Sequence, residues 1–125
     1  MRVELNYGKG LLPVEIDDSW DVSVIRKPQM PVNPDPGRAI ELALTQPIEC
    51  DTLLEQARGK SSACVLVCEI TRPVPNGDLL PVILRQLLAA GMTRESIRIL
   101  IATGLHRPNE GEELAELIGD QWVLE

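Results

Sequence analysis

The sequence contains very few aromatic residues: two tryptophans, one tyrosine and no phenylalanine among 125 residues. A core must therefore be built from aliphatic side chains, and a surface on which successive nucleic-acid bases stack is not expected. Basic residues are also in the minority, and the formal net charge of −7 argues against a general binder of the DNA or RNA backbone. We therefore expect no nucleic-acid partner.

Cysteines and long hydrophobic runs are scarce as well. An odd number of cysteines, three, without a signal peptide predicts reduced thiols and a cytoplasmic protein. No apolar run approaches the roughly 20 residues of a membrane span, so no membrane partner is expected. Cys64 and Cys68 are expected to be small buried hydrophobic residues, because their spacing is not that of a zinc knuckle. A metal site that they form with His106, the single histidine, is the alternative.

Residues 1–27 are predicted to be rich in β structure. Polar and apolar residues alternate over 2–6, glycines follow in a turn, and 12–16 form a second strand, which together indicate a hairpin. Residues 21–25 are a third, shorter candidate strand. Four prolines in 28–37 exclude a helix or a central strand through that segment and predict a loop.

Residues 38–125 are predicted to form an α/β core. Continuous apolar runs at 63–68 and 97–102 are typical of strands buried in a parallel sheet. Helices are expected at 38–44, 52–58, 79–90 and 111–118. The order β-α-β-α predicts a parallel, Rossmann-like sheet with right-handed crossovers.

The ends of these elements carry further signals. Asp51 is expected to cap the helix at 52–58, and Asn109 with Glu112 the helix at 111–118. Val123 and Leu124 suggest a further strand that is cut short. We therefore expect the N-terminal part of a larger catalytic domain, whose exposed sheet edge promotes formation of a homo-oligomer.

Two similar segments follow the two predicted strands: Thr71-Arg72-Pro73 and His106-Arg107-Pro108. The two Arg-Pro pairs are 35 residues apart, close to one βα unit. Both should lie at the carboxyl edge of the sheet, where open α/β sheets bind ligands and helix N-termini add positive potential. This pattern predicts one wall of a site for a small anion.

The residues of this wall offer specific chemistry. An arginine can bind a carboxylate or phosphate through two parallel hydrogen bonds, and a histidine can transfer a proton near neutral pH. A neighbouring carboxylate and hydroxyl can orient the imidazole, and a glycine lets a ligand approach the backbone. The candidates are Glu69, Thr71, Arg72, Gly104, His106 and Arg107. The alternatives are that either arginine pairs with an acidic residue of the protein, and that the histidine is a surface or capping residue.

Three segments in this order are similar to the N-terminal signatures of the nickel-pincer lactate racemase family: Tyr7-Gly8-Lys9-Gly10, Thr71-Arg72-Pro73-Val74-Pro75 and Ala102-Thr103-Gly104-Leu105-His106-Arg107-Pro108. The resemblance implies racemisation or epimerisation of a 2-hydroxy acid. It further implies a nickel-pincer cofactor derived from nicotinic acid mononucleotide, which accepts hydride while a histidine takes the hydroxyl proton.

By this resemblance His106 is one of two catalytic histidines, and Arg72 is near substrate and cofactor. Glu69 stands where the family usually has the shorter aspartate, and Leu105 where a threonine is common. The second histidine, the lysine that tethers the cofactor and the histidine that binds nickel would lie beyond residue 125. We therefore expect the isolated chain to bind no nickel cofactor and to be inactive.

Two other functions remain open. One is a non-catalytic α/β module that binds a small anion or a protein partner. The other is a different reaction of a hydroxy acid on the same scaffold.

Overall fold

Two strands joined by a glycine-containing turn begin the chain, as the alternating pattern predicts. β1 (Arg2–Tyr7) and β2 (Gly10–Glu15) pair antiparallel, with Val3 opposite Val14. Gly8 has a φ of +57°, in the left-handed region that favours glycine, and this permits the tight turn. The computed structural model describes all 125 residues and divides them into two units, Met1–Val32 and Asn33–Glu125.

The prediction of a third strand at 21–25 is wrong, since residues 21–32 contain neither helix nor strand. Ile25 is 96% exposed. β-propensity produces a strand only where a neighbouring strand accepts its backbone hydrogen bonds, and no strand of this unit pairs with the segment.

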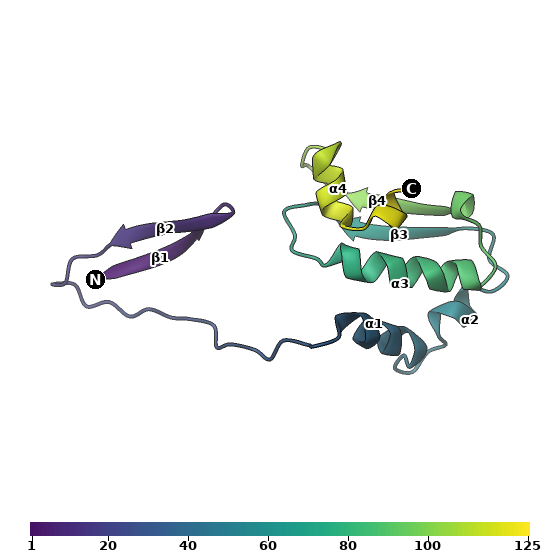
Figure 1. Cartoon of the computed structure of the whole chain (residues 1–125), viewed down its shortest axis with the longest axis horizontal. Helices are drawn as coiled ribbons and strands as arrows, with labels where there is room; N and C mark the ends of the chain where they lie inside the picture. The colour runs from purple at the N-terminus through teal and green to yellow at the C-terminus, as the bar shows by residue number, and fades with distance from the viewer. The chain divides into compact units, whose positions relative to one another are not determined.

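The second unit is a two-layer α/β structure (Figure 1). Its two parallel strands run in register from Ala63 opposite Ile97 to Cys68 opposite Ala102. Its elements are α1 (Pro36–Thr45), α2 (Leu53–Ala57), β3 (Ala63–Cys68), α3 (Asn76–Ala89), η1 (Arg94–Ser96), β4 (Ile97–Ala102), α4 (Glu112–Ile118) and α5 (Gln121–Leu124). α3 is the crossover between the strands, which confirms the predicted β-α-β-α order.

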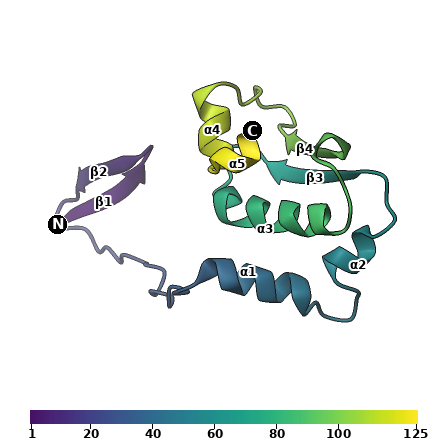
Figure 2. The ribbon, with the colours of Figure 1, turned by 45° about the vertical axis from the view of Figure 1, so that its right-hand side comes forward.

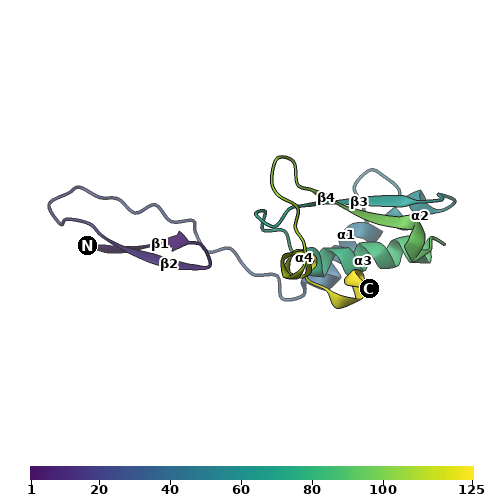
Figure 3. The same cartoon turned by 90° about the horizontal axis from the view of Figure 1, so that it is seen from above.

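The helices pack on one side of the two strands. α1 lies beside α3 (Figure 2), and Figure 3 shows α3 and α4 on the same side of the two strands. The core between the layers is aliphatic, as the lack of aromatic residues requires. Its most buried member is Leu80, 1% exposed, which packs with Val67 and Ile118. None of these helices has the length and apolar character needed to cross a membrane.

The opposite face of the sheet is uncovered. Leu66 is 67% exposed and Leu100 is 53% exposed, and Cys64 and Cys68 are exposed beside them. The predicted burial of both cysteines is therefore wrong. A continuous apolar run predicts two covered faces, but the helices of this unit cover only one, so alternate side chains of each strand face outward.

Three predictions about the ends of elements are also corrected. Gln121–Leu124 form helix α5 rather than the start of a strand, because Asp120 Oδ1 accepts a hydrogen bond from Val123 N at 3.0 Å and caps a helical turn. Helix α2 is capped by Thr52 in a capping box with Glu55, not by Asp51. Asn109 caps no helix, since Gly111 directly precedes α4.

A close contact between glycines fixes α3 against α4. A Cβ atom at Gly77 would lie 2.7 Å from the carbonyl oxygen of Gly119, so only glycine fits. Beside it the buried Asn76 donates from Nδ2 to the Leu117 carbonyl oxygen at 3.0 Å. These two contacts hold the N-terminus of α3, and therefore the loop from β3, in place relative to α4.

Candidate functional site

The two predicted segments lie side by side. Cys68 and Ala102, the last residues of β3 and β4, are direct partners in the sheet, so the loops that follow them leave the same edge. Both loops therefore start at the carboxyl edge of the parallel sheet. This is the position at which α/β sheets bind ligands.

Glu69, the first residue after β3, is a buried carboxylate, 5% exposed. Its Oε2 accepts a hydrogen bond from the backbone N of Thr71 at 2.8 Å, and its Oε1 accepts one from the Thr71 hydroxyl. The Thr71 hydroxyl, then the Thr71 amide and to a smaller degree His106, hold the pKa of Glu69 below its usual value. Glu69 is therefore ionised at neutral pH, in spite of its burial.

His106 faces this carboxylate across the two loops. Its Nδ1 lies 3.2 Å from Glu69 Oε1, and its side chain is 54% exposed. The backbone N of His106 donates to the Thr103 carbonyl oxygen at 2.9 Å, closing a turn that Gly104 enters with a φ of +58°. Because an ionised carboxylate only accepts hydrogen bonds, Nδ1 carries the ring hydrogen. Nε2 then has the free electron pair of a general base.

The two arginines differ in their partners. Arg107 donates from Nη1 and Nη2 to the two carboxylate oxygens of Glu113 at 2.6 and 2.7 Å. This bidentate pair raises the pKa of Arg107 and lowers that of Glu113. Arg107 is thus paired with an acidic residue of the protein, as the alternative interpretation expected, and its guanidinium is not free to bind a ligand. The Arg72 guanidinium has no hydrogen-bond or ion-pair partner.

Two hollows adjoin the Glu69–His106 pair. The larger, of about 340 Å³, is lined by Cys68, Glu69, Arg72, Ala102, Thr103, Gly104, Leu105 and His106. The smaller, of about 290 Å³, is lined by Glu69, Ile70, Thr71, His106, Arg107 and Asn109. The structure therefore brings together all six predicted site residues, with Arg72 on one side of the pair and Arg107 on the other.

Asn109 is a site residue that the sequence interpretation missed. It is buried, its Oδ1 accepts from Ile70 N at 3.4 Å, and its Nδ2 donates to Glu113 Oε2 at 3.0 Å. It thus connects the loop after β4 with the loop after β3. The spacing of four residues between Asn109 and Glu113 could have indicated their contact. The sequence analysis instead paired Asn109 with Glu112 in a capping box.

The donor set of the site fits an anion rather than a metal ion. Nowhere in the chain do three or more histidine, cysteine, aspartate or glutamate side chains gather in a way that could hold a metal ion. Glu69 is already occupied by Thr71 and His106. The unpaired Arg72 guanidinium, in contrast, suits a carboxylate or a phosphate.

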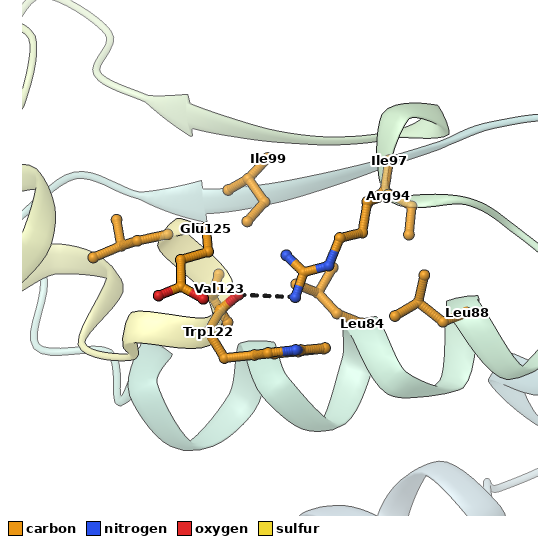
Figure 4. A pocket seen from close by; sticks show the side chains of 9 residues that line it. Leu84, Leu88, Arg94, Ile97, Ile99, Trp122, Val123 and Glu125 are labelled. Atoms are coloured by element: carbon orange, nitrogen blue, oxygen red, sulfur yellow. Dashed lines mark hydrogen bonds between the residues drawn. The ribbon is translucent and has the colours of Figure 1, made fainter.

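A third hollow, of about 240 Å³, lies between α3, β4 and α5 (Figure 4). Its walls are mainly aliphatic, with Trp122 on one side. Arg94 donates to the Trp122 carbonyl oxygen at 3.0 Å, and its guanidinium lies 4.5 Å from the centre of the Trp122 ring. Arg94 and Glu125 also line it, but it contains no histidine that could transfer a proton near neutral pH. For this reason we place the candidate active site at the carboxyl edge of the sheet.

The fold and the site define an α/β domain with a carboxylate–histidine pair and an unpaired arginine at the carboxyl edge of its parallel sheet. Residues 7–124 match the family model for the lactate racemase N-terminal domain, and the chain belongs to this family. This confirms the resemblance stated from the sequence motifs.

Relatives of known activity support the assignment. The chain is 34% identical over 125 residues to the lactate racemase of Lactiplantibacillus plantarum and 29% identical over 124 residues to that of Thermoanaerobacterium thermosaccharolyticum. Each match covers 98% of this chain and 29% of the relative. The solved structure of the lactate racemase apoprotein from T. thermosaccharolyticum is similar with a TM-score of 0.70 and 28% identity, covering 98% of this chain and 28% of that one. The chain thus spans less than a third of the length of these relatives.

Proposed function

We propose that this chain supplies the proton-transfer and anion-binding residues of an enzyme that racemises or epimerises a 2-hydroxy acid. The observation that carries the proposal is the 3.2 Å contact between His106 Nδ1 and the buried Glu69 carboxylate, which leaves Nε2 available as a base. The unpaired Arg72 beside it suits the substrate carboxylate. The two relatives that are lactate racemases support a reaction of this class.

In the proposed reaction, Arg72, His106 and Glu69 each have a separate role. Arg72 binds the substrate carboxylate, and the substrate hydroxyl donates to Nε2 of His106. A hydride acceptor outside this chain would take hydride from the α-carbon while Nε2 takes the hydroxyl proton, and a 2-oxo acid would remain. Return of hydride to the opposite face of the carbonyl carbon, with return of the proton to oxygen, gives the inverted 2-hydroxy acid. The Glu69 carboxylate stabilises the imidazolium that forms between these steps.

This reaction requires a hydride acceptor. A nickel-pincer mononucleotide, which the family resemblance implies, supplies reversible hydride acceptance when bound. The residues of this chain do not fit a nickel ligand set, so the nickel ligands would belong to the rest of the full-length protein. Arg72 would contribute one anion contact, to the substrate carboxylate or to the nucleotide phosphate.

The test uses the full-length gene, expressed with the enzymes that make the cofactor. Nickel content is measured, and racemisation of a panel of 2-hydroxy acids is followed by chiral chromatography. His106→Ala should lower kcat by about 10²- to 10⁴-fold, the usual contribution of general acid–base catalysis. Glu110→Ala is the matched control, because Glu110 is exposed in the same loop and lines neither hollow.

Turnover by His106→Ala at the wild-type rate would contradict the assignment of His106 as the base.

The second candidate function is a non-catalytic module that binds a small anion, and the free guanidinium of Arg72 favours it. A full-length protein that binds a 2-hydroxy acid but racemises none would support this second function.

A further inference from the structure

Leu105 is an apolar side chain held entirely in solvent, with a relative exposure of 104%. It occupies the tip of the tight turn from Thr103 to His106, which the hydrogen bond from His106 N to Thr103 O closes at 2.9 Å. In this position the side chain is not packed against the sheet. Covering exposed apolar surface is favourable in water, so the position favours an apolar contact.

The surroundings of Leu105 are those of the proposed reaction. Leu105 lines the larger hollow together with Arg72 and His106. Apart from the polar and charged side chains, this hollow is walled by Cys68, Ala102 and Gly104, which are small or apolar. One hollow therefore offers a cation, a base and an apolar wall.

A 2-hydroxy acid has three groups on its α-carbon besides hydrogen: a carboxylate, a hydroxyl and a side chain. Arg72 suits the carboxylate and His106 Nε2 suits the hydroxyl, so the side chain of the acid is the group left for the wall at Leu105. We propose that Leu105 is a specificity-determining residue that contacts this side chain and selects 2-hydroxy acids with an apolar side chain larger than methyl. The inference rests on the proposed function and names its substrate class.

The experiment compares two substrates in one enzyme preparation. The ratio of kcat/KM for 2-hydroxy-4-methylpentanoate to that for lactate is measured for the full-length wild type, Leu105→Asn, Leu105→Met and Ile48→Asn. This ratio does not depend on the fraction of enzyme that is folded, because both substrates meet the same molecules. Ile48 is 90% exposed and lies outside the hollow, so its variant removes similar apolar surface elsewhere.

The wild type should prefer the branched acid. Leu105→Asn should lower the ratio by about tenfold, within the range observed for the loss of one apolar contact. Leu105→Met keeps an apolar side chain of similar size and should stay within about threefold of wild type. Ile48→Asn should leave the ratio unchanged.

An unchanged ratio in Leu105→Asn, with racemisation intact in the wild type, overturns this inference alone. A fall in both kcat/KM values by the same factor also overturns it, since Leu105 would then pack against protein rather than substrate. A wild type that racemises neither acid nor any other 2-hydroxy acid of the panel overturns the proposed function, and this inference with it.

Discussion

Thr71 directs both its hydroxyl and its backbone amide at Glu69. A buried carboxylate needs such partners, because burial without them would favour the neutral acid. The hydroxyl is therefore the largest cause of the lowered pKa of Glu69, the partner of His106. Thr71 acts as a positioning residue, since its contacts are with Glu69.

The contribution of this hydroxyl can be measured directly. Thr71→Val removes the hydroxyl but keeps the shape and the backbone amide, so the pKa of Glu69 should rise towards its ordinary value of 4.5. Thr71→Ser retains the hydroxyl and should leave the pKa low. The measurement is an NMR titration of the Glu69 side-chain carboxyl carbon. Equal pKa values in the Val and Ser variants would show that the hydroxyl has no such role.

The same lowered pKa predicts how stability depends on pH. A carboxylate whose pKa is lowered by folding adds stability above its unfolded pKa and loses it as the pH falls through the folded value. Between pH 7 and pH 3, the free energy of unfolding of wild type should therefore fall more steeply than that of Glu69→Gln, which has no group to titrate there. Urea unfolding at several pH values measures both slopes, and parallel slopes would contradict the expectation.

The arginines give a matched comparison within the site. Arg72→Ala removes an unpaired guanidinium and should raise the KM for a 2-hydroxy acid in the full-length enzyme by about tenfold or more, since charge-assisted hydrogen bonds to a carboxylate are strong. Arg107→Ala breaks only the pair with Glu113 and should change KM less. Steady-state kinetics measures KM for both variants. A larger increase in KM for Arg107→Ala than for Arg72→Ala would contradict the assignment of Arg72 as the residue that binds the substrate carboxylate.

At the scale of elements, the alternation of polar and apolar residues predicted the hairpin, and continuous apolar runs predicted both strands of the parallel sheet. Such patterns failed where the outcome depends on one particular side-chain contact or on how the helices pack. Val123 and Leu124 have the composition of a strand, but the side chain of Asp120 caps a helical turn there. Cys64 and Cys68 lie in an apolar run, and only the packing of the helices decides which face of β3 is covered.

The candidate site, too, could be predicted from the sequence only in part. Its position at the sheet edge could be predicted from two Arg-Pro pairs spaced by one βα unit. The separate roles of Arg72 and Arg107 could not, because they depend on the side chain of Glu113 in the first turn of α4. The connection through Asn109 escaped for the same reason, since its partner Ile70 is 39 residues away.

The glycine contact between α3 and α4 gives a prediction for an element. Gly77→Ala places a methyl group 2.7 Å from a backbone oxygen of Gly119, and the helices must move apart. We expect destabilisation of about 1–3 kcal/mol, the usual effect of overpacking. Gly37→Ala in α1 is the control, because its nearest atom is 3.8 Å away and alanine favours a helix. Urea unfolding measures both, and equal stability of the two variants would contradict the expectation.

At the scale of the whole molecule, the most unusual surface of the 125-residue chain is the uncovered face of its parallel sheet. Parallel sheets are ordinarily covered on both faces, and here Leu66 and Leu100 stand in solvent. We expect this chain to self-associate as its concentration rises. Sedimentation velocity should show the effect reduced in Leu66→Lys and unchanged in Ile48→Lys, which adds the same charge at an exposed site outside the sheet. A strict monomer at high concentration would contradict this expectation.

Cys68 joins the uncovered face to the larger hollow, since its thiol is exposed and also lines the space beside Arg72. The rate at which a small alkylating reagent modifies this thiol will therefore report whether the hollow is filled. Cys64, exposed on the same face of β3 and outside the hollow, serves as an internal reference in the same mass spectrum. Compounds that occupy the hollow can be found in this way before any reaction is known, with the chain's own sulfur atoms as the reporter.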